Sequence, residues 1–227
     1  MKNKLIIALD VNTYGRAVKL IDKLSEHVGM FKVGSELFTA CGPKIIRYLK
    51  KKKKKVFLDL KFHDIPNTVG GAVLAASGLG ADMLTIHASG GAAMLESAAR
   101  AARGAKRKPL LVAVTALTSL RASKREVLSL AKLAKVSGID GCVSSPKETK
   151  MIKKSCGRKF VVINPGVRPA WAAQDDQKRI ATPLDAVRDG ADYIVVGRPV
   201  TRAQDPASAA LKILGEISVK AVKRKVK

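Results

Sequence analysis

Short apolar runs alternate with segments of helical spacing along almost the whole chain. Each run is rich in aliphatic residues and is followed closely by a polar residue or a glycine, a pattern typical of a buried strand. The predicted strands cover residues 4–10, 29–34, a run beginning at Val56, 82–87, 110–117, 139–144, 160–164 and 193–196. The pattern therefore predicts eight strands.

Apolar residues recur at helical spacing in the segments between these runs. The predicted helices lie near residues 17–24, 43–49, 69–79, 94–102, 128–134, 148–154, 183–188 and 206–222. Alternating strands and helices predict a parallel sheet, and eight such units in one chain predict a closed (β/α)8 barrel, the TIM-barrel fold. No linker divides the sequence, so residues 1–227 are expected to form a single domain. An open doubly wound sheet is the alternative, although its usual glycine fingerprint is missing.

Composition narrows the class of protein. Hydrophobic residues make up 47% of the 227 residues, enough for a substantial core. No apolar run approaches the roughly 18 residues of a membrane span, and Asp10 interrupts the first apolar run too early for a signal peptide. Three scattered cysteines, Cys41, Cys142 and Cys156, favour reduced thiols over a disulfide framework or a zinc site. We expect a cytoplasmic protein without membrane contact.

The net charge of +25 is unusually high, with 43 Lys and Arg against 18 Asp and Glu. Six lysines are consecutive at residues 50–55, and a second basic cluster comprises Lys220, Lys223, Arg224, Lys225 and Lys227. Such a balance attracts anions, including nucleic acid and phosphorylated metabolites. Neither cluster is interleaved with the aromatic residues that single-strand binding uses. We interpret both as solvated faces and expect no nucleic-acid partner.

Polar residues collect where the predicted strands end. In a (β/α)8 barrel the carboxyl ends of all strands meet at one mouth, where the chemistry is located. The residues at these positions are Asp10, Lys32, Asp59, Lys61, Asp64, His87, Thr118, Arg168, Gly197 and Arg198. An arginine beside a glycine after the eighth strand suits a phosphate group, because the loops after strands seven and eight often bind phosphate in such barrels. For His87, simple packing is favoured over a role as a base.

The stretch from Val56 to Thr68, VFLDLKFHDIPNT, organises this mouth. It begins as a buried strand and ends in a Pro-Asn turn before the next helix. Alternation places Asp59 and Lys61 on the same side of the strand. Two carboxylates and an ammonium within six residues are costly to bury unless they bind one another or a ligand. A solvated strand end with an incidental ion pair is the simpler alternative.

The string from Leu58 to Thr68 resembles the signature of the bacterial-type orotidine 5'-phosphate decarboxylase family. A bare D-x-K-x-x-D also occurs in related sugar-phosphate enzymes, whereas the continuation HDIPNT is more specific. Further segments resemble the family in the same order: ALD at 8–10, FKVG at 31–34, IHASGG at 86–91, VTALTS at 114–119, PGVRP at 165–169, DQKR at 176–179 and VGRP at 196–199. The resemblance spans about residues 4 to 206. It departs from the usual family pattern at Asn164 and at residues 141–145, which leaves the charged residues unaffected.

The resemblance implies a homodimer that decarboxylates orotidine 5'-monophosphate to uridine 5'-monophosphate, the last step of de novo pyrimidine synthesis. It implies Lys61 as general acid, with Asp59 and Lys32 as its charged partners and Asp64 reaching in from the other subunit. The implied substrate-binding residues are Asp10, Lys32, Thr68, Thr118, Ser119, Arg168, Gln177, Gly197 and Arg198. Thr68 is expected to serve the other subunit's site, as Asp64 does.

The implied reaction uses neither a cofactor nor a metal. No cofactor-binding motif is evident in the sequence, and the resemblance implies that electrostatic stabilisation replaces the usual electron sink. Two alternatives remain open at this point. The first is a Mg²⁺-dependent sugar-phosphate decarboxylase or aldolase of the same superfamily, and the second is a basic nucleic-acid-binding barrel. Trp171 lies in the long seventh loop, where either a lid or an ordinary exposed loop is expected.

Overall fold

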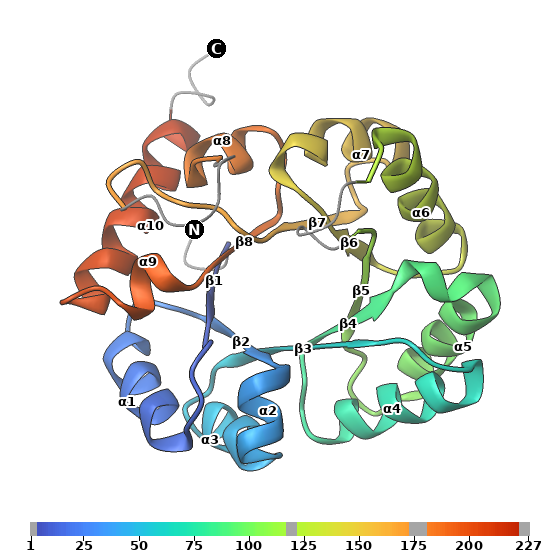
Figure 1. The fold of residues 1–227 in the computed structure, drawn as a ribbon, viewed down its shortest axis with the longest axis horizontal. Coiled ribbons are helices and arrows are strands. Elements are labelled where there is room, and N and C mark those ends of the chain that lie inside the picture. The colour runs from blue at the N-terminus through green and yellow to red at the C-terminus, as the bar shows by residue number, and fades with distance from the viewer. Residues whose placement is uncertain (1–3, 117–121, 173–180, 223–227) are drawn as a thin grey trace.

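The chain forms a closed barrel of eight parallel strands surrounded by helices (Figure 1). The computed structural model describes residues 4–116, 122–172 and 181–222. The strands are β1 (Leu5–Ala8), β2 (Met30–Gly34), β3 (Lys55–Phe62), β4 (Met83–His87), β5 (Leu110–Val114), β6 (Gly141–Val143), β7 (Val161–Asn164) and β8 (Tyr193–Val196). Each strand pairs with its neighbours in sequence, and β1 pairs with β8 to close the ring. The predicted TIM-barrel fold is confirmed.

The helices form the outer layer of the barrel (Figure 1). They are α1 (Tyr14–Leu24), α2 (Ser35–Cys41), α3 (Lys44–Lys51), α4 (Pro66–Gly78), η1 (Ala88–Gly90), α5 (Gly91–Gly104), α6 (Lys124–Val136), η2 (Pro146–Glu148), α7 (Thr149–Cys156), α8 (Pro183–Arg188), α9 (Arg198–Thr201) and α10 (Pro206–Val222). The short elements α2, α9, η1 and η2 were not predicted. Helix α10 packs against α1, α8 and α9, and so joins the two ends of the helical layer. Over the described ranges, no helix is both long and apolar enough to span a membrane.

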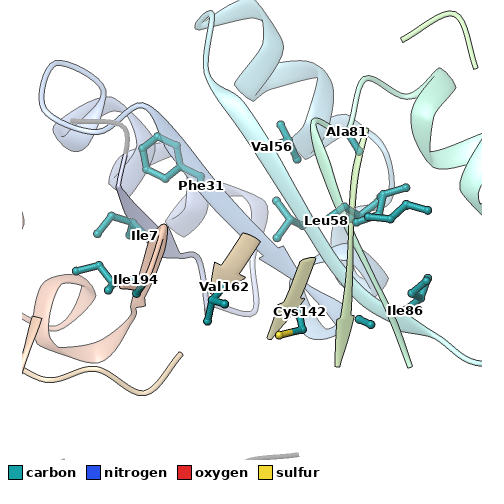
Figure 2. Packing of buried hydrophobic residues seen from close by; sticks show 14 of the residues in the cluster. Ile7, Phe31, Val56, Leu58, Ala81, Ile86, Cys142, Val162 and Ile194 are labelled. Carbon is teal, nitrogen blue, oxygen red and sulfur yellow. The ribbon is translucent and has the colours of Figure 1, made fainter. Parts of the chain in front are cut away.

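Strand side chains alternate between two hydrophobic layers. Those that point into the barrel form a small cluster, which includes Phe57, Val112 and Ile163. Those that point outward pack against the helices in the main core, and Figure 2 shows members such as Ile7 and Val162. With the interior filled by apolar side chains, polar groups are confined to the two ends of the barrel.

Three Gly-x-Asp segments hold the amino end of the barrel together. They immediately precede the even-numbered strands β4, β6 and β8, and they are residues 80–82, 138–140 and 190–192. Each glycine has a positive φ, at 92°, 84° and 109°, a conformation that other residues rarely adopt.

The aspartate of each segment binds the preceding strand through both its backbone and its side chain. Asp192 N–H donates to the Val162 carbonyl, and Asp192 Oδ2 accepts from the Val162 N–H at 2.7 Å. Asp82 and Asp140 bind Val56 and Leu111 in the same way. A lysine completes each group at 2.6–3.0 Å: Lys153 for Asp192, Lys50 for Asp82 and Lys108 for Asp140. We call these three groups the aspartate clamps.

Candidate active site

A cavity of about 300 Å³ opens at the carboxyl ends of the strands. Its deeper wall is apolar, with Phe57, Val114 and Ile163 among the residues that form it. Its charged residues follow strands that are far apart in sequence: Asp10, Lys32, Asp59, Lys61, Arg168 and Arg198. With Gly197, which also lines it, the cavity brings together seven of the residues predicted from strand ends alone.

Four of these side chains form a chain of alternating charge. Lys32 Nζ lies 3.0 Å from Asp10 Oδ1 and 3.5 Å from Asp59 Oδ2. Lys61 Nζ lies 3.0 Å from Asp59 Oδ1. The two central side chains, Lys32 and Asp59, are only 14% and 12% exposed, whereas Lys61 is 36% exposed. Because every charge in this half-buried row has an opposite neighbour, the row can hold an ammonium group against a bound substrate without leaving a charge uncompensated.

The backbone of Lys61 is unusual. Its φ is +52°, in the left-handed region that a residue with a side chain seldom occupies. The pairing of β3 with β4 shifts register between Leu58 and Phe62, and Lys61 lies within this irregularity. Strained residues of this kind persist only where the surrounding structure holds them, and they concentrate at functional sites.

Glycines leave room for this row of charges. A Cβ at Gly34 would lie 3.1 Å from Lys32 Nζ, and a Cβ at Gly197 would lie 3.3 Å from Asp10 Oδ2. Both distances are tighter than an ordinary carbon contact. Small residues at these two strand ends therefore allow the charged side chains to approach each other.

Two arginines that follow β7 and β8 also line the cavity. Arg168 follows β7 and is only 5% exposed, and Arg198 begins α9 directly after β8. The backbone N–H of Arg168 donates a hydrogen bond to the Ala181 carbonyl at 3.2 Å, which holds the loop in place. Guanidinium groups match the geometry of phosphate oxygens. The cavity therefore combines the carboxylate–ammonium row with two cationic groups suited to an anion.

Asp64 and Thr68 lie outside this cavity in their own chain. Both are exposed, and the Asp64 carboxylate accepts a hydrogen bond from the N–H of Ile65. Asp64 lines a separate, open hollow together with His63 and Ser89. Three further predicted binding residues, Thr118, Ser119 and Gln177, fall outside the described residues.

His87 packs at the edge of the site, as predicted. Its ring stacks on His63 with centroids 5.1 Å apart. Burial is the largest cause that lowers the pKa of His87 below its ordinary value, and electrostatic interactions with His63 and Lys61 lower it further.

Within the described parts of the chain, no three His, Cys, Asp or Glu side chains cluster in a way that could hold a metal ion. Between Asp10 and Asp59, the position that a cation would take is occupied by Lys32 Nζ.

In the long loop after β7, Trp171 is exposed, with Lys212 Nζ 5.7 Å from its ring centroid.

Sequence reasoning missed one residue of the site, Thr85 on β4. Its side chain is 1% exposed and does not line the cavity, yet its hydroxyl contacts both Asp59 and the backbone of Lys61. A threonine in the middle of an apolar strand carries no signal of its own. Its position two residues before the strand-end His87 was the only available hint.

A closed parallel barrel with a charged cavity at the carboxyl ends of its strands defines a (β/α)8-barrel enzyme. Residues 3–213 match the Orotidine 5'-phosphate decarboxylase / HUMPS family, and the chain belongs to this family. It is 48% identical to the orotidine 5'-phosphate decarboxylase of Moorella thermoacetica over 235 residues, covering 96% of this chain and 93% of the relative. It is 51% identical to the enzyme of the same name from Trichlorobacter lovleyi over 230 residues, covering 95% of each.

Solved structures show the same similarity. The crystal structure of orotidine 5'-phosphate decarboxylase from Lactobacillus acidophilus superposes with a TM-score of 0.84 at 38% sequence identity. The alignment covers 96% of this chain and all of that chain. The shared fold therefore extends over nearly the whole barrel.

Proposed function

We propose that this protein decarboxylates orotidine 5'-monophosphate to uridine 5'-monophosphate and CO2 in pyrimidine biosynthesis. Family membership and the identity of about half of all residues to orotidine 5'-phosphate decarboxylases support this carboxy-lyase reaction. The observation that carries the mechanism is the Lys61 ammonium, held 3.0 Å from Asp59 Oδ1 in the charged cavity at the carboxyl ends of the strands. The relatives and the lysine between Asp10 and Asp59 both disfavour the Mg²⁺-dependent alternative.

The chemical problem is a carbanion at C6 of the pyrimidine. When the bond between C6 and the carboxylate breaks, CO2 leaves and the electron pair stays on C6. Lys61 stabilises this charge and then donates its proton to C6, after which solvent reprotonates the amine. Asp59 and Lys32 fix the ammonium in place, so its reorganisation costs little during the reaction. No electron-sink cofactor enters these steps.

Substrate binding is assigned to the remaining residues of the mouth. Arg198, Gly197 and Gln177 hold the phosphate, and Arg168 contributes a further positive charge. Asp10 binds a ribose hydroxyl, and Thr118 or Ser119 binds the pyrimidine. Contacts to groups remote from C6 supply binding energy that orients the base for reaction.

We also propose a homodimer in which Asp64 and Thr68 complete the other subunit's site. Both residues are exposed and lie away from their own cavity. Two large apolar side chains nearby are also exposed, Ile65 at 66% and Leu74 at 48%. Exposed apolar side chains beside polar site residues are typical of a subunit interface.

The three cysteines are free thiols, and burial raises the pKa of Cys142 to about 12. Three unpaired cysteines support a reducing, cytoplasmic location.

The first experiment measures the loss of ultraviolet absorbance after orotidine 5'-monophosphate is added to the purified protein, with and without EDTA. We expect rapid loss that is unaffected by the chelator. Lys61→Ala should reduce turnover at least about a thousandfold while the protein stays folded. The matched control is Lys55→Ala, an exposed lysine at the other end of the same strand, which should keep full activity. Near-normal turnover of Lys61→Ala would remove Lys61 from the proton-donor role, and chelator sensitivity would favour the Mg²⁺-dependent alternative.

The shared site is tested by mixing two inactive chains, Lys61→Ala and Asp64→Ala. In a mixed dimer, one site combines an intact Lys61 with an intact Asp64 from the other chain. Activity should recover to about a quarter of the wild-type value if the chains assort randomly into symmetric dimers. If the mixture of the two variants stays inactive after subunit exchange, Asp64 does not serve the partner's site.

A further inference from the structure

Thr85 joins the two central residues of the site through one hydroxyl group. The Lys61 N–H donates to Thr85 Oγ1 at 2.8 Å, and the Thr85 hydroxyl donates to Asp59 Oδ1 at 3.0 Å. Asp59 Oδ1 is also the atom that receives Lys61 Nζ at 3.0 Å. The backbone and the side chain of Lys61 are thus tied to Asp59 by separate contacts.

A hydroxyl group has only one hydrogen to donate. A carboxylate oxygen can only accept, so the Thr85 hydrogen is directed at Asp59, while a lone pair of Thr85 Oγ1 accepts from the Lys61 N–H. This direction fixes the rotation of the Asp59 carboxylate, with Oδ1 toward Lys61 and Oδ2 toward Lys32. Thr85 is buried on β4, so water does not compete for either bond.

The hydrogen bond from the Lys61 N–H to Thr85 Oγ1 stabilises the unusual backbone conformation of Lys61. At Lys61 the left-handed conformation coincides with the shift of register between β3 and β4. The regular ladder is interrupted there, and the Thr85 side chain accepts the hydrogen bond of the Lys61 N–H. A buried N–H without an acceptor would favour relaxation of the strained turn toward ordinary strand geometry.

We propose that Thr85 is a positioning residue, which holds the proton donor Lys61 and its partner Asp59 in register for the reaction. The inference rests on the proposed decarboxylase function. Thr85 itself touches no substrate group, since it does not line the cavity. Its contribution is to fix where the ammonium lies relative to C6, a placement for which an error of about 1 Å can cost about a hundredfold in rate.

The test compares Thr85→Val, which keeps the shape and removes the hydroxyl, with Thr85→Ser, which keeps the hydroxyl. We expect Thr85→Val to lower kcat about ten- to a hundredfold with little change in KM, and Thr85→Ser to restore kcat to within a few fold of wild type. The pH profile of kcat should shift in Thr85→Val and not in Thr85→Ser. Loss of kcat in both variants, or in neither, would overturn the proposal.

The matched control is Thr149→Val on α7. Thr149 is fully buried and its hydroxyl donates to Asn164 Oδ1 at 2.9 Å, away from the charged row. The Thr149→Val variant should lose thermal stability, while its kcat and the pH profile of kcat stay unchanged. If Thr85→Val behaves in the same way, its role is merely structural.

A crystal structure of Thr85→Val separates this inference from the proposed function, because it needs no activity. We expect Lys61 Nζ to move beyond ion-pair distance of Asp59 Oδ1, or Lys61 to lose its positive φ. An unchanged Lys61–Asp59 pair would overturn the proposal even in an active enzyme. Absence of turnover in the wild-type protein would refute the decarboxylase function but not the structural expectation.

Discussion

The two ends of the barrel use the same residue types for opposite purposes. At the amino end, the three aspartate clamps pair each aspartate with one lysine and with the backbone of the preceding strand. At the carboxyl end, Asp59 contacts two lysines and Lys32 contacts two aspartates, in a continuous row. Aspartate–lysine pairs alone therefore do not distinguish structure from catalysis.

The difference lies in what the carboxylates bind. A clamp aspartate accepts from a main-chain N–H, so it joins two strands and contributes to folding. Among the described residues, the contacts of the Asp59 carboxylate are with the side chains of Lys32, Lys61 and Thr85. We expect substitutions at the amino end to lower stability and substitutions at the carboxyl end to lower activity, as is general for this fold.

The largest expected effect is that of Asp59→Asn. The amide keeps the shape but removes the charge that positions the ammonium of Lys61, so turnover should fall at least about a thousandfold. The midpoint of thermal unfolding should move by only a few degrees. Asp82→Asn is the matched control at the amino end and should show the reverse pattern. A stability loss larger in Asp59→Asn than in Asp82→Asn would contradict the division between the two ends.

Much of the fold was predictable because each strand is a short apolar run. The eight strands and the helices at 183–188 and 206–222 follow from local pattern alone. The short helices α2 and α9 were missed, since elements of seven and four residues leave too little periodicity to detect. The Gly-x-Asp repeat is visible in the sequence, but only the paired strands show that it binds the backbone.

The site was predictable to the extent that strand ends converge in a barrel. Asp10, Lys32, Asp59 and Lys61 meet because their strands are neighbours around the ring. Thr85 was not predictable, because its role depends on a register shift between two strands. The roles of Asp64 and Thr68 depend on a second chain and stay predictions.

Substitutions in the aspartate clamps should lower the free energy of unfolding by an intermediate amount. Lys153 is 13% exposed and also donates to the carbonyls of Arg158 and Phe160, whereas Lys108 is 52% exposed. Asp192→Ala should therefore cost about 2 kcal/mol of unfolding free energy, lowering the thermal midpoint by about 5 °C. Asp140→Ala should cost less, and both variants should keep wild-type kcat/KM. Equal losses in the two variants would show that the exposure of the lysine partner does not set the strength of a clamp.

The smallest expected effect is a dependence of stability on pH that arises at His87, at the carboxyl end of β4. Since the pKa of folded His87 is lowered, the unfolded chain binds a proton more readily below about pH 6.5, the ordinary value for histidine. The stabilisation is therefore fully present above that pH and is lost as the pH falls through the pKa of the folded state. Thermal unfolding between pH 5 and pH 8 should show this loss, and His87→Gln should reduce it. His63→Gln should reduce it partly, because His63 is one of the neighbours that lower the pKa of His87. An identical pH dependence in His87→Gln and wild type would place the titrating group elsewhere in the barrel.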